Sequence, residues 1–453
     1  MEKSQIYDFV ILGGGIAGLT FARQATRGGK RVVVLESADR VGGLSRTFDF
    51  EGYRFDIGGH RLVSPWPQVI DWVREEVHDE LVQVARRSHI FLNGRYIDYP
   101  LQVPNALFAF PPLKALEVLA SYLGASLRSR IGRADASFED WVVRRFGRSL
   151  YEIYFRPYTE KVWGTSCGEL ASEFAVQRIK VPSLAAAVRG SLFHGTAPAG
   201  SLVSQFYYPA QGFGTITDRL AESVQAGGLG EILVNSPVHR LEQEGEDGGW
   251  RVYYRQGGEE RCVSGRQVIS TIPLDRLFGM LPRAAEAEGL PVGELIYRSM
   301  ICVCLAVDAP QISDDTWTYF PDSSLIFGRT HEPSNWSAAM VPPGKTSLVT
   351  EIFCTVGDAV WDRSDADITG RVVADLERLE LVTRRHVEGA WLVRVPYAYP
   401  VYRLGYQDRL NRLREYLTRW PTLHLAGRTG MFRYLNADGV IKHTLELAAH
   451  LVK

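Results

Sequence analysis

YDFVILGGGIAGLTFARQATRGGKRVVVLE (residues 7–36) is the stretch that decides the fold. A short apolar run leads into GGGIAG, an alanine-containing segment follows, and a second apolar run ends in Glu36. This order predicts a strand, a glycine-rich turn, a helix and a second strand, which is the βαβ unit that binds dinucleotides. We therefore expect an α/β fold built on a Rossmann-like nucleotide-binding domain.

Three glycines and one acid in this stretch have separate roles in binding a dinucleotide. Gly13 permits the tight turn, Gly15 lets the backbone approach a pyrophosphate, and Gly18 lets the helix pack closely on the strand. The helix N-terminus presents free N–H groups and the positive end of its dipole to the phosphates. Glu36 is placed to accept hydrogen bonds from an adenosine ribose, and an acid there disfavours a 2′-phosphate. FAD or NAD is therefore expected rather than NADP.

The composition is that of an ordinary globular protein. The chain has 453 residues, which predicts two or three domains, and it is 45% hydrophobic and 23% charged. A formal net charge of -1 gives no field that would attract nucleic acid, so no nucleic-acid partner is expected. The five cysteines have no zinc-binding spacing, so we expect reduced thiols and no metal site. Cys302 and Cys304 alternate along a predicted strand and should share one face.

No segment of the sequence predicts stable membrane insertion. The N-terminus leads directly into the first strand, which leaves no room for a signal peptide. No uncharged apolar stretch reaches the roughly 18 residues of a membrane span, so we expect a cytoplasmic protein. Residues 103–127 are the most apolar region and predict a core helix. Contact with a membrane or a lipid-linked substrate is the alternative for this region.

The segment SADRVGGLSRTFDFEGYRFDIGGHRL follows the second strand and extends the predicted phosphate site. Arg40, Gly42 and Gly43 combine a cation with small residues that allow close approach of the backbone. This pattern resembles the amine-oxidase and protoporphyrinogen-oxidase superfamily of flavoproteins, in which such residues continue the pyrophosphate cradle of FAD. A glycine before a histidine, here Gly59 and His60, recurs in that superfamily beside the isoalloxazine ring. The alternative for His60 is a histidine at the surface or satisfied in the core.

The C-terminal stretch LHLAGRTGMFRYLNADGVIKHTLELAAHLVK has the same order of strand, glycine turn and helix N-terminus. Gly427 and Arg428 at the strand end, with Asp438 at the helix start, resemble the motif that closes the FAD site in the same superfamily. Val238, in ILVNSPVHRL, corresponds to its adenine-side strand. The resemblance implies a two-dinucleotide-binding-domain flavoprotein of the GR2 type. FAD would be the cofactor, bound by one domain assembled from both ends of the chain.

The central stretch FRPYTEKVWG (155–164) mixes aromatic and charged residues and is interrupted by proline and glycine. We expect a loop or helix junction at the mouth of the flavin site, and the alternative is an aromatic hinge that packs the helices onto the FAD domain. The stretch resembles the YTxKxWG segment of UDP-galactopyranose mutase, and Glu169-Leu170 and Arg178-Ile179 follow in that family's order. LIFGRTHEPSNW, SLVTEIFC and AYPVYRLGY continue the likeness toward the C-terminus.

The mutase resemblance implies a redox-neutral reaction on a nucleotide sugar or another glycosyl compound in carbohydrate biosynthesis. Reduced flavin N5 attacks the anomeric carbon and expels the diphosphate, ring opening and closure interconvert pyranose and furanose, and NADH or NADPH would reduce the FAD. The resemblance makes His60, Arg178 and Arg329 the catalytic residues, with both arginines on the diphosphate. It places Tyr158 and Trp163 against the substrate, with the indole packing on a nucleobase. The alternative for each arginine is a structural ion pair.

The C-terminal motif departs from the mutase pattern. Tyrosines and an aspartate that reach the substrate in that family are replaced here by Phe432, Tyr434, Leu435 and Asn436. Tyr434 and Asn436 remain candidates for substrate binding. The second hypothesis is therefore a FAD-dependent oxidase, dehydrogenase or reductase of the protoporphyrinogen oxidase or desaturase type, in which a hydride passes to or from flavin.

The motifs divide the chain into three regions. An FAD-binding domain holds both glycine motifs, a helical insertion follows the first of them, and a mixed or antiparallel sheet forms the substrate domain. HIFLNGRYIDYP alternates around an Asn-Gly turn and predicts a hairpin that joins this second sheet. A homodimer is compatible with this organisation. The expected bounds are 1–90, 200–275 and 390–453 for the FAD-binding domain, 100–200 for the helical insertion, and 276–390 with 89–100 for the substrate domain.

Overall fold

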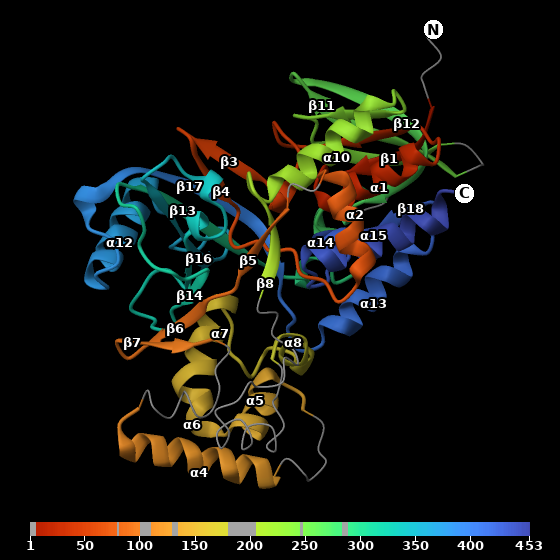
Figure 1. Cartoon of the computed structure of the whole chain (residues 1–453). Coiled ribbons are helices and arrows are strands. Elements are labelled where there is room, and N and C mark those ends of the chain that lie inside the picture. Colours follow the sequence, from red (N-terminus) through yellow and green to blue (C-terminus); the bar gives the residue numbers. More distant parts are fainter. Residues whose placement is uncertain are drawn as a thin grey trace.

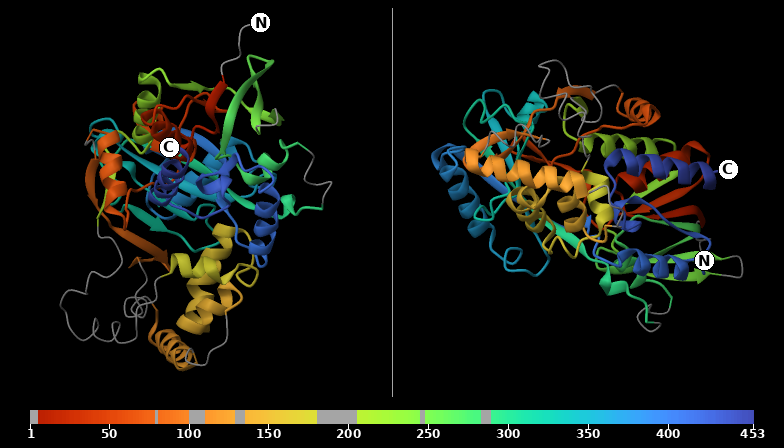
Figure 2. Two further views of the ribbon diagram at one scale, coloured as in Figure 1. Left: turned by 90° about the vertical axis from the view of Figure 1, so that its right-hand side faces the viewer. Right: turned by 90° about the horizontal axis from the view of Figure 1, so that it is seen from below.

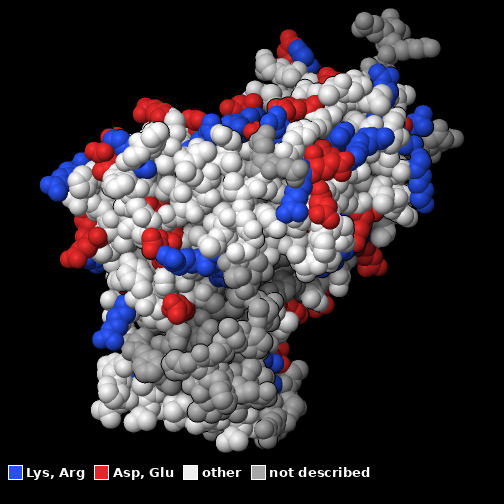
Figure 3. Space-filling view, viewed as in Figure 1, with Lys and Arg blue, Asp and Glu red and all other residues white. Residues whose placement is uncertain are grey.

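Two seven-stranded sheets and a lobe of helices make up the chain (Figure 1). The helical lobe projects from the body that contains the sheets, as the left view of Figure 2 shows. Acidic and basic side chains are interspersed on the face drawn in Figure 3. The structure is a computed structural model that describes residues 6–78, 81–99, 110–128, 135–179, 205–244, 248–282 and 289–453, with only the backbone of Arg128, Gln177 and Arg178.

The first sheet has a parallel centre that joins segments from both ends of the chain. Its parallel strands are β1 (Ile6–Leu12), β2 (Val32–Leu35), β9 (Gly230–Leu233), β12 (Glu259–Ser270) and β18 (Leu423–Leu425). β1 lies between β2 and β12, β9 extends the sheet beyond β2, and β18 pairs with the end of β12. β10 (Val238–Glu244) and β11 (Gly249–Gln256) continue the sheet from β12 as antiparallel strands. The predicted βαβ unit therefore shares its sheet with a C-terminal strand.

Helices pack on both faces of the first sheet. The helices are α1 (Ile16–Arg27), α10 (Gly214–Ala226), α13 (Tyr406–Leu417) and α15 (Ala437–Leu451). Ile11 and Val34 belong to the core that includes residues of α1, α10 and α15. Val10 and Val33 belong to the opposite core, together with residues of α13. This alternation along the strands buries the sheet between two layers.

The second sheet is antiparallel except for one pair of strands. Its strands are β6 (Ser88–Leu92), β7 (Arg95–Asp98), β13 (Tyr297–Val307), β14 (Trp317–Tyr319), β15 (Arg329–His331), β16 (Thr346–Cys354) and β17 (Val387–Pro400). The order is β17-β13-β16-β15-β14-β6-β7, and only β14 and β6 run parallel. The hairpin predicted at residues 89–100 is β6–β7. An α/β fold with a Rossmann-like domain and a mixed second sheet is thus confirmed.

One face of the second sheet is covered by α12 (Asp365–Arg378). Ile301 and Val303 of β13 pack there with Ile368 of the helix. Cys302 and Cys304 lie on the opposite face, in the core that extends to the first sheet. The prediction that these two thiols share a face is confirmed, and all five cysteines are free.

β17 crosses the boundary that the sequence predicts at residue 390. It pairs with β13 from Val387 to Pro400, with a few register shifts. Residues 390–400 therefore belong to the second sheet rather than to the FAD-binding domain. The chain rejoins the first sheet only at β18, because α13 comes between the two strands.

Two short strand pairs and one helix complete the body of the chain. They are β3 (Thr47–Phe50) with β4 (Tyr53–Asp56), β5 (Leu81–Ala85) with β8 (Gln205–Pro209), and α2 (Pro67–Glu76). The buried carboxylate of Asp56 accepts hydrogen bonds from Thr47 Oγ1 at 2.6 Å, Tyr208 Oη at 2.7 Å and Phe213 N at 3.1 Å. One carboxylate thus joins β3, β8 and the segment before α10.

The described helices of the lobe lie between residues 112 and 178, inside the bounds 100–200 expected for the helical insertion. Its helices are α4 (Pro112–Arg128), α5 (Phe138–Phe146), α6 (Arg148–Leu150), α7 (Arg156–Trp163) and α8 (Ser172–Arg178). Ser137 and Asp140 form a reciprocal capping box that starts α5. Gly147, with φ 83°, ends this helix.

The stretch at 155–164 is not a loop but contains a helix junction, which was the other form that the sequence leaves open. A π-helical turn (Tyr151–Phe155) leads directly into α7, and Pro157 occupies the first turn of α7, where a missing N–H is tolerated. The helix ends at Gly164, with φ 64°. Its cations are already used by the protein, because Arg156 pairs with Glu152 at 2.6 Å and Lys161 donates to two backbone carbonyls.

α4 differs from the core helix expected at 103–127. The described helix begins at Pro112, and residues 103–109 lie outside the described residues. Leu113, Leu116 and Leu127 are 84%, 64% and 70% exposed, so one side of α4 is not covered by the described chain. Within the described ranges, none of the helices has the length and apolar character needed to cross a membrane.

Asp56→Asn should change how stability depends on pH. Burial raises the pKa of Asp56 to about 6, so its neutral form stabilises the fold below pH 3.8 and this contribution is lost as pH rises through about 6. The lost contribution is about 3 kcal/mol. Denaturant unfolding between pH 4 and 7 should show a flatter profile for Asp56→Asn than for the wild type, whereas the exposed control Asp71→Asn should retain the wild-type slope. Parallel profiles for all three proteins would contradict this expectation.

Candidate functional site

The glycine turn after β1 borders an open cradle. Gly13 has φ 98°, and a Cβ on Gly18 would lie 2.0 Å from the Gly13 carbonyl oxygen. A Cβ on Gly15 would meet nothing closer than Gly43 Cα at 3.9 Å. Helix–strand packing therefore requires glycine at 18, whereas the absence of a side chain at 15 leaves space at the N-terminus of α1.

Segments from both ends of the chain meet at this cradle. The Gly42 N–H donates to the Gly14 carbonyl at 2.8 Å, which holds the second glycine segment against the first. Gly427, with φ 79°, begins α14 (Gly427–Gly430), and a Cβ on it would lie 3.1 Å from Ala17 Cβ. The two predicted half-sites, about 400 residues apart, are thus in contact.

Glu36 lies at the end of β2, beside the cradle. Its carboxylate accepts hydrogen bonds from Gly14 N at 2.7 Å and Ala38 N at 2.8 Å. Its carbonyl accepts from Ser236 N at 2.8 Å, which brings the start of β10, and with it Val238, next to this end of β2. A buried carboxylate at this position can accept hydrogen bonds from ribose hydroxyl groups.

Arg40 and Asp438 are the charged residues predicted for the cofactor. Arg40 is partly exposed and lies 3.8 Å from Asp218, so its guanidinium is held weakly. Asp438 lies in the first turn of α15, where burial raises the pKa of its carboxyl. Asn436, the N-cap of α15, makes no side-chain capping hydrogen bond. Together with the glycine cradle and Glu36, these residues fit a dinucleotide such as FAD, because exposed backbone, a helix N-terminus and an acid occur where pyrophosphate and ribose need them.

The turn at residues 58–60 lies against the second sheet. A Cβ on Gly59 would lie 2.0 Å from Trp317 Nε1, so close packing requires glycine there. The buried Nδ1 of His60 has no hydrogen-bond partner among the described residues. Burial, followed by the nearby charge of Arg428, lowers the pKa of His60 to about 4. The imidazole is therefore neutral at physiological pH and has one nitrogen available for a ligand.

Glu351, in the middle of β16, connects this turn to the second sheet. Its fully buried carboxylate accepts from Gly59 N at 3.2 Å and binds the Arg329 guanidinium through two contacts, one of them Nε to Oε1 at 2.9 Å. Burial alone would raise the pKa of Glu351, but Arg329 and His331 lower it to about 2. Arg329 therefore forms a structural ion pair, which was the alternative to its predicted role on a diphosphate.

Trp163 lies in a cluster of aromatic rings rather than at an open edge. Its ring centre is 4.4 Å from that of Phe174, 5.8 Å from Tyr399 and 6.1 Å from Tyr434, all edge-on. Tyr399 and Tyr434 stack at 5.7 Å, and the Arg428 guanidinium carbon lies 5.4 Å from the centre of each ring. Trp163 is buried, so its faces pack against protein, in contrast to the stacking surface expected for a nucleobase.

The other predicted substrate residues have mixed outcomes. Tyr158 of α7 contacts Tyr319 of β14 edge-on at 5.8 Å, which links the helical lobe to the second sheet. Arg428 donates to the Leu435 carbonyl at 2.7 Å and so holds the loop that carries Tyr434. Arg178 ends α8, and its side chain lies outside the described residues.

Three residues of this region are absent from the sequence prediction. Glu351 could have been found, because an acid inside an otherwise apolar strand must have a buried partner. Tyr399 gives no comparable signal, because many strands end in tyrosine. Thr271 donates to the Leu12 carbonyl at 2.8 Å and packs on Gly13, a contact that joins two strands far apart in the sequence.

Comparison with known proteins agrees with a flavin site. Residues 16–450 match the model of the flavin containing amine oxidoreductase family. Coproporphyrinogen III oxidase of Mycobacterium tuberculosis is 25% identical over 95% of this chain and 94% of its own length. Protoporphyrinogen oxidase 1 of spinach chloroplasts is 22% identical over 91% of this chain and 78% of its own length. The crystal structure of reduced UDP-galactopyranose mutase covers 98% of this chain and 95% of its own, with 23% identity and a TM-score of 0.84.

The family model spans nearly the whole chain, and the mutase shares its fold. The relatives are enzymes, and the family implies FAD as cofactor, in agreement with the cradle around Gly15. The chain therefore belongs to the flavin containing amine oxidoreductase family.

Proposed function

We propose that this protein is a FAD-dependent oxidoreductase acting on a small anionic substrate bound between the turn at 58–60 and the aromatic cluster around Tyr399. Bound FAD would supply hydride transfer at its isoalloxazine ring. The observation that carries the proposal is the buried Arg329–Glu351 pair, because it engages Nε and Nη2 of one of the two arginines that the mutase resemblance places on a diphosphate. The likeness to two porphyrinogen oxidases, over 91% and 95% of this chain, supports the same reaction class.

The chain's own groups suit a net redox reaction. His60 is neutral, and its unpartnered Nδ1 can accept a hydrogen bond from a substrate. The Glu351 carboxylate holds the backbone of the turn that carries His60. Tyr399 is partly buried, and burial raises the pKa of its hydroxyl, so it stays protonated and can donate. The aromatic rings around it exclude water from the region where a substrate would bind.

The second candidate is a mutase-type isomerase acting on a nucleotide sugar or glycosyl compound, with FAD reduced by NADH or NADPH. Its support is the order of the YTEKVWG and GRTHEP segments along the chain, together with the fold shared with UDP-galactopyranose mutase. In this chain Glu351 engages Nε and Nη2 of Arg329, so this arginine could contact a diphosphate through Nη1 or after the ion pair opens. With this function we also propose that the protein is located in the cytoplasm and forms a homodimer.

Gly15→Val should remove FAD without unfolding the protein. A Cβ at this position would meet no close protein atom and would project into the cradle, so FAD content should fall about tenfold or more while the apoprotein keeps its unfolding temperature. The flavin absorbance of purified protein and its melting temperature measure the two effects. Gly370→Val, at a helical position with nothing within 4 Å, is the matched control and should retain FAD. Full FAD content in Gly15→Val would place the pyrophosphate elsewhere.

Arg329→Met should destabilise the protein by about 3–5 kcal/mol, because it leaves the Glu351 carboxylate buried without its partner. Arg329→Met/Glu351→Gln should recover part of this loss, since the glutamine can still accept from Gly59 N. Denaturant unfolding of the FAD-loaded variants measures both changes. A stable Arg329→Met protein with weaker binding of a nucleotide diphosphate would instead support the mutase candidate.

Anaerobic mixing should separate the two reaction classes. FAD-loaded protein is combined with coproporphyrinogen III, protoporphyrinogen or UDP-galactopyranose, and flavin absorbance and product are followed together. A redox enzyme should lose oxidised-flavin absorbance in proportion to the product formed. Conversion of UDP-galactopyranose by pre-reduced protein, at constant flavin absorbance, would overturn the proposed oxidoreductase.

A further inference from the structure

Arg61 and Arg86 place two cations close together near the turn at 58–60. Arg61 lies over the Trp317 ring with its guanidinium carbon 5.6 Å from the ring centre, and Arg86 lies 5.1 Å from the centre of Tyr99. Within the described chain, neither guanidinium forms an ion pair, and the polar contact of Arg86 is a long hydrogen bond to Ser88 Oγ at 3.4 Å. The sequence motifs assign no role to either arginine.

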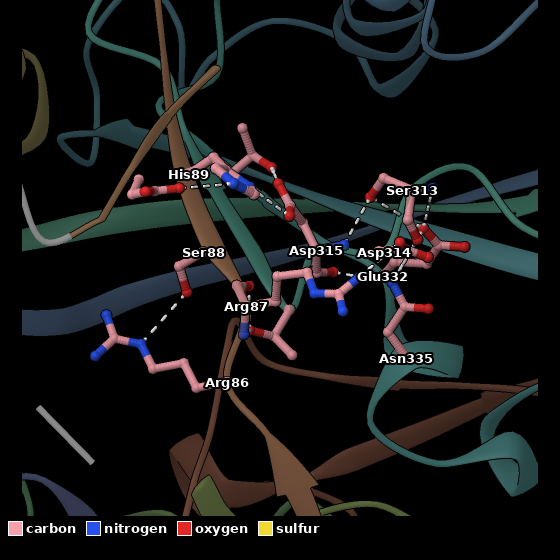
Figure 4. A network of polar contacts seen from close by, with 12 residues as sticks. Arg86, Arg87, Ser88, His89, Ser313, Asp314, Asp315, Glu332 and Asn335 are labelled. Carbon is pink, nitrogen blue, oxygen red and sulfur yellow. Dashed lines mark hydrogen bonds and ion pairs between the residues drawn. The ribbon is translucent and has the colours of Figure 1, made fainter. Parts of the chain in front are cut away.

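The residues beside Arg86 are paired with acids, in contrast to Arg86 itself. Arg87 Nη1 lies 2.6 Å from Asp314 Oδ2, and His89 Nδ1 lies 2.6 Å from Asp315 Oδ1. In Figure 4 these side chains converge on the acids, whereas Arg86 points the other way, toward Ser88. The orientation of Arg86 is therefore not set by the acidic residues nearest to it in the fold.

The two cations lie between the turn at 58–60 and an aromatic wall. Arg61 directly follows His60. Its positive charge lowers the pKa of Asp438, and Tyr434 raises the pKa of Arg61. Tyr99 packs against Tyr319 with ring centres 4.5 Å apart, and both tyrosines raise the pKa of Arg61. Arg61 therefore lies next to the region proposed above for the substrate, and Arg86 lies over Tyr99 of the aromatic wall.

A half-buried pair of like charges is unfavourable unless an anion compensates it. Burial is the largest cause that lowers the pKa of Arg61; nearby Tyr319 offsets part of this effect, and the charge of Arg86 lowers the pKa further. A guanidinium stays protonated in spite of such shifts. The repulsion between the two positive charges is therefore reduced by binding an anion rather than by losing a proton. Two guanidinium forks can bind several oxygens of a carboxylate or a phosphate.

We propose that Arg61 and Arg86 form an anion-binding subsite that holds a carboxylate or phosphate group of the substrate against the Tyr99–Tyr319 wall. Calling the bound anion a substrate group rests on the proposed function, whereas the anion site itself does not. The charge of Arg61 also lowers the pKa of Asp438, a residue predicted for the cofactor site, so anion binding is to be measured with FAD bound.

Calorimetric titration of the FAD-loaded protein with inorganic pyrophosphate and with succinate tests the subsite directly. Arg61→Gln and Arg86→Gln should each weaken binding of the preferred anion about tenfold or more, because each removes a charged hydrogen-bond donor. Arg87→Gln, which removes the neighbouring cation already paired with Asp314, is the matched control and should bind as the wild type does. Tighter binding of pyrophosphate would assign a phosphate ester, and tighter binding of succinate a carboxylate.

Three results would overturn the subsite. They are failure of both anions to bind the FAD-loaded protein, equal weakening in Arg87→Gln, and loss of FAD from Arg61→Gln or Arg86→Gln, which would assign the cations to the cofactor. The proposed function fails independently, because anion binding is measured without turnover. Intact anion binding together with mutase activity would support the anion subsite and contradict the proposed oxidoreductase function.

Discussion

The close approach of α1 to β1 is the constraint on which the rest of the structure depends. Gly18 admits no side chain, because a Cβ would lie 2.0 Å from the Gly13 carbonyl oxygen. Only this contact lets the helix N-terminus, the segment at Gly42 and the C-terminal turn at Gly427 meet around one cradle. The parallel strands supply the platform, and the missing side chains supply the space.

The second sheet holds the turn at 58–60 in place through one buried carboxylate. Glu351 binds Arg329 within the sheet and the backbone of Gly59 outside it, so the turn that carries His60 is fixed to β16 rather than left as a free loop. Breaking either contact would leave a charge or a backbone N–H unsatisfied. Chemistry beside the first sheet is thus positioned by the second.

Local signals in the sequence predict the first glycine turn, its acid and the C-terminal turn, because glycine spacing next to apolar runs is set by backbone sterics. Nonlocal packing is not predicted. Arg329 is expected on a diphosphate from the mutase resemblance, and its pairing with Glu351, 22 residues away, leaves no local signal. The stretch from 155 to 164 is expected as a loop or a helix junction, because proline and glycine mark a break without showing that a π-helical turn leads into α7. β17 is assigned to the wrong sheet because strand pairing depends on residues far apart.

The contact between the Gly15 and Gly427 segments sets an order of events during synthesis. The first half of the cradle leaves the ribosome about 400 residues before the second, so a growing chain cannot yet form the complete cradle. Cofactor capture must follow completion of β18 and α14. Chains that stop short of those elements would keep an intact first βαβ unit and remain colourless.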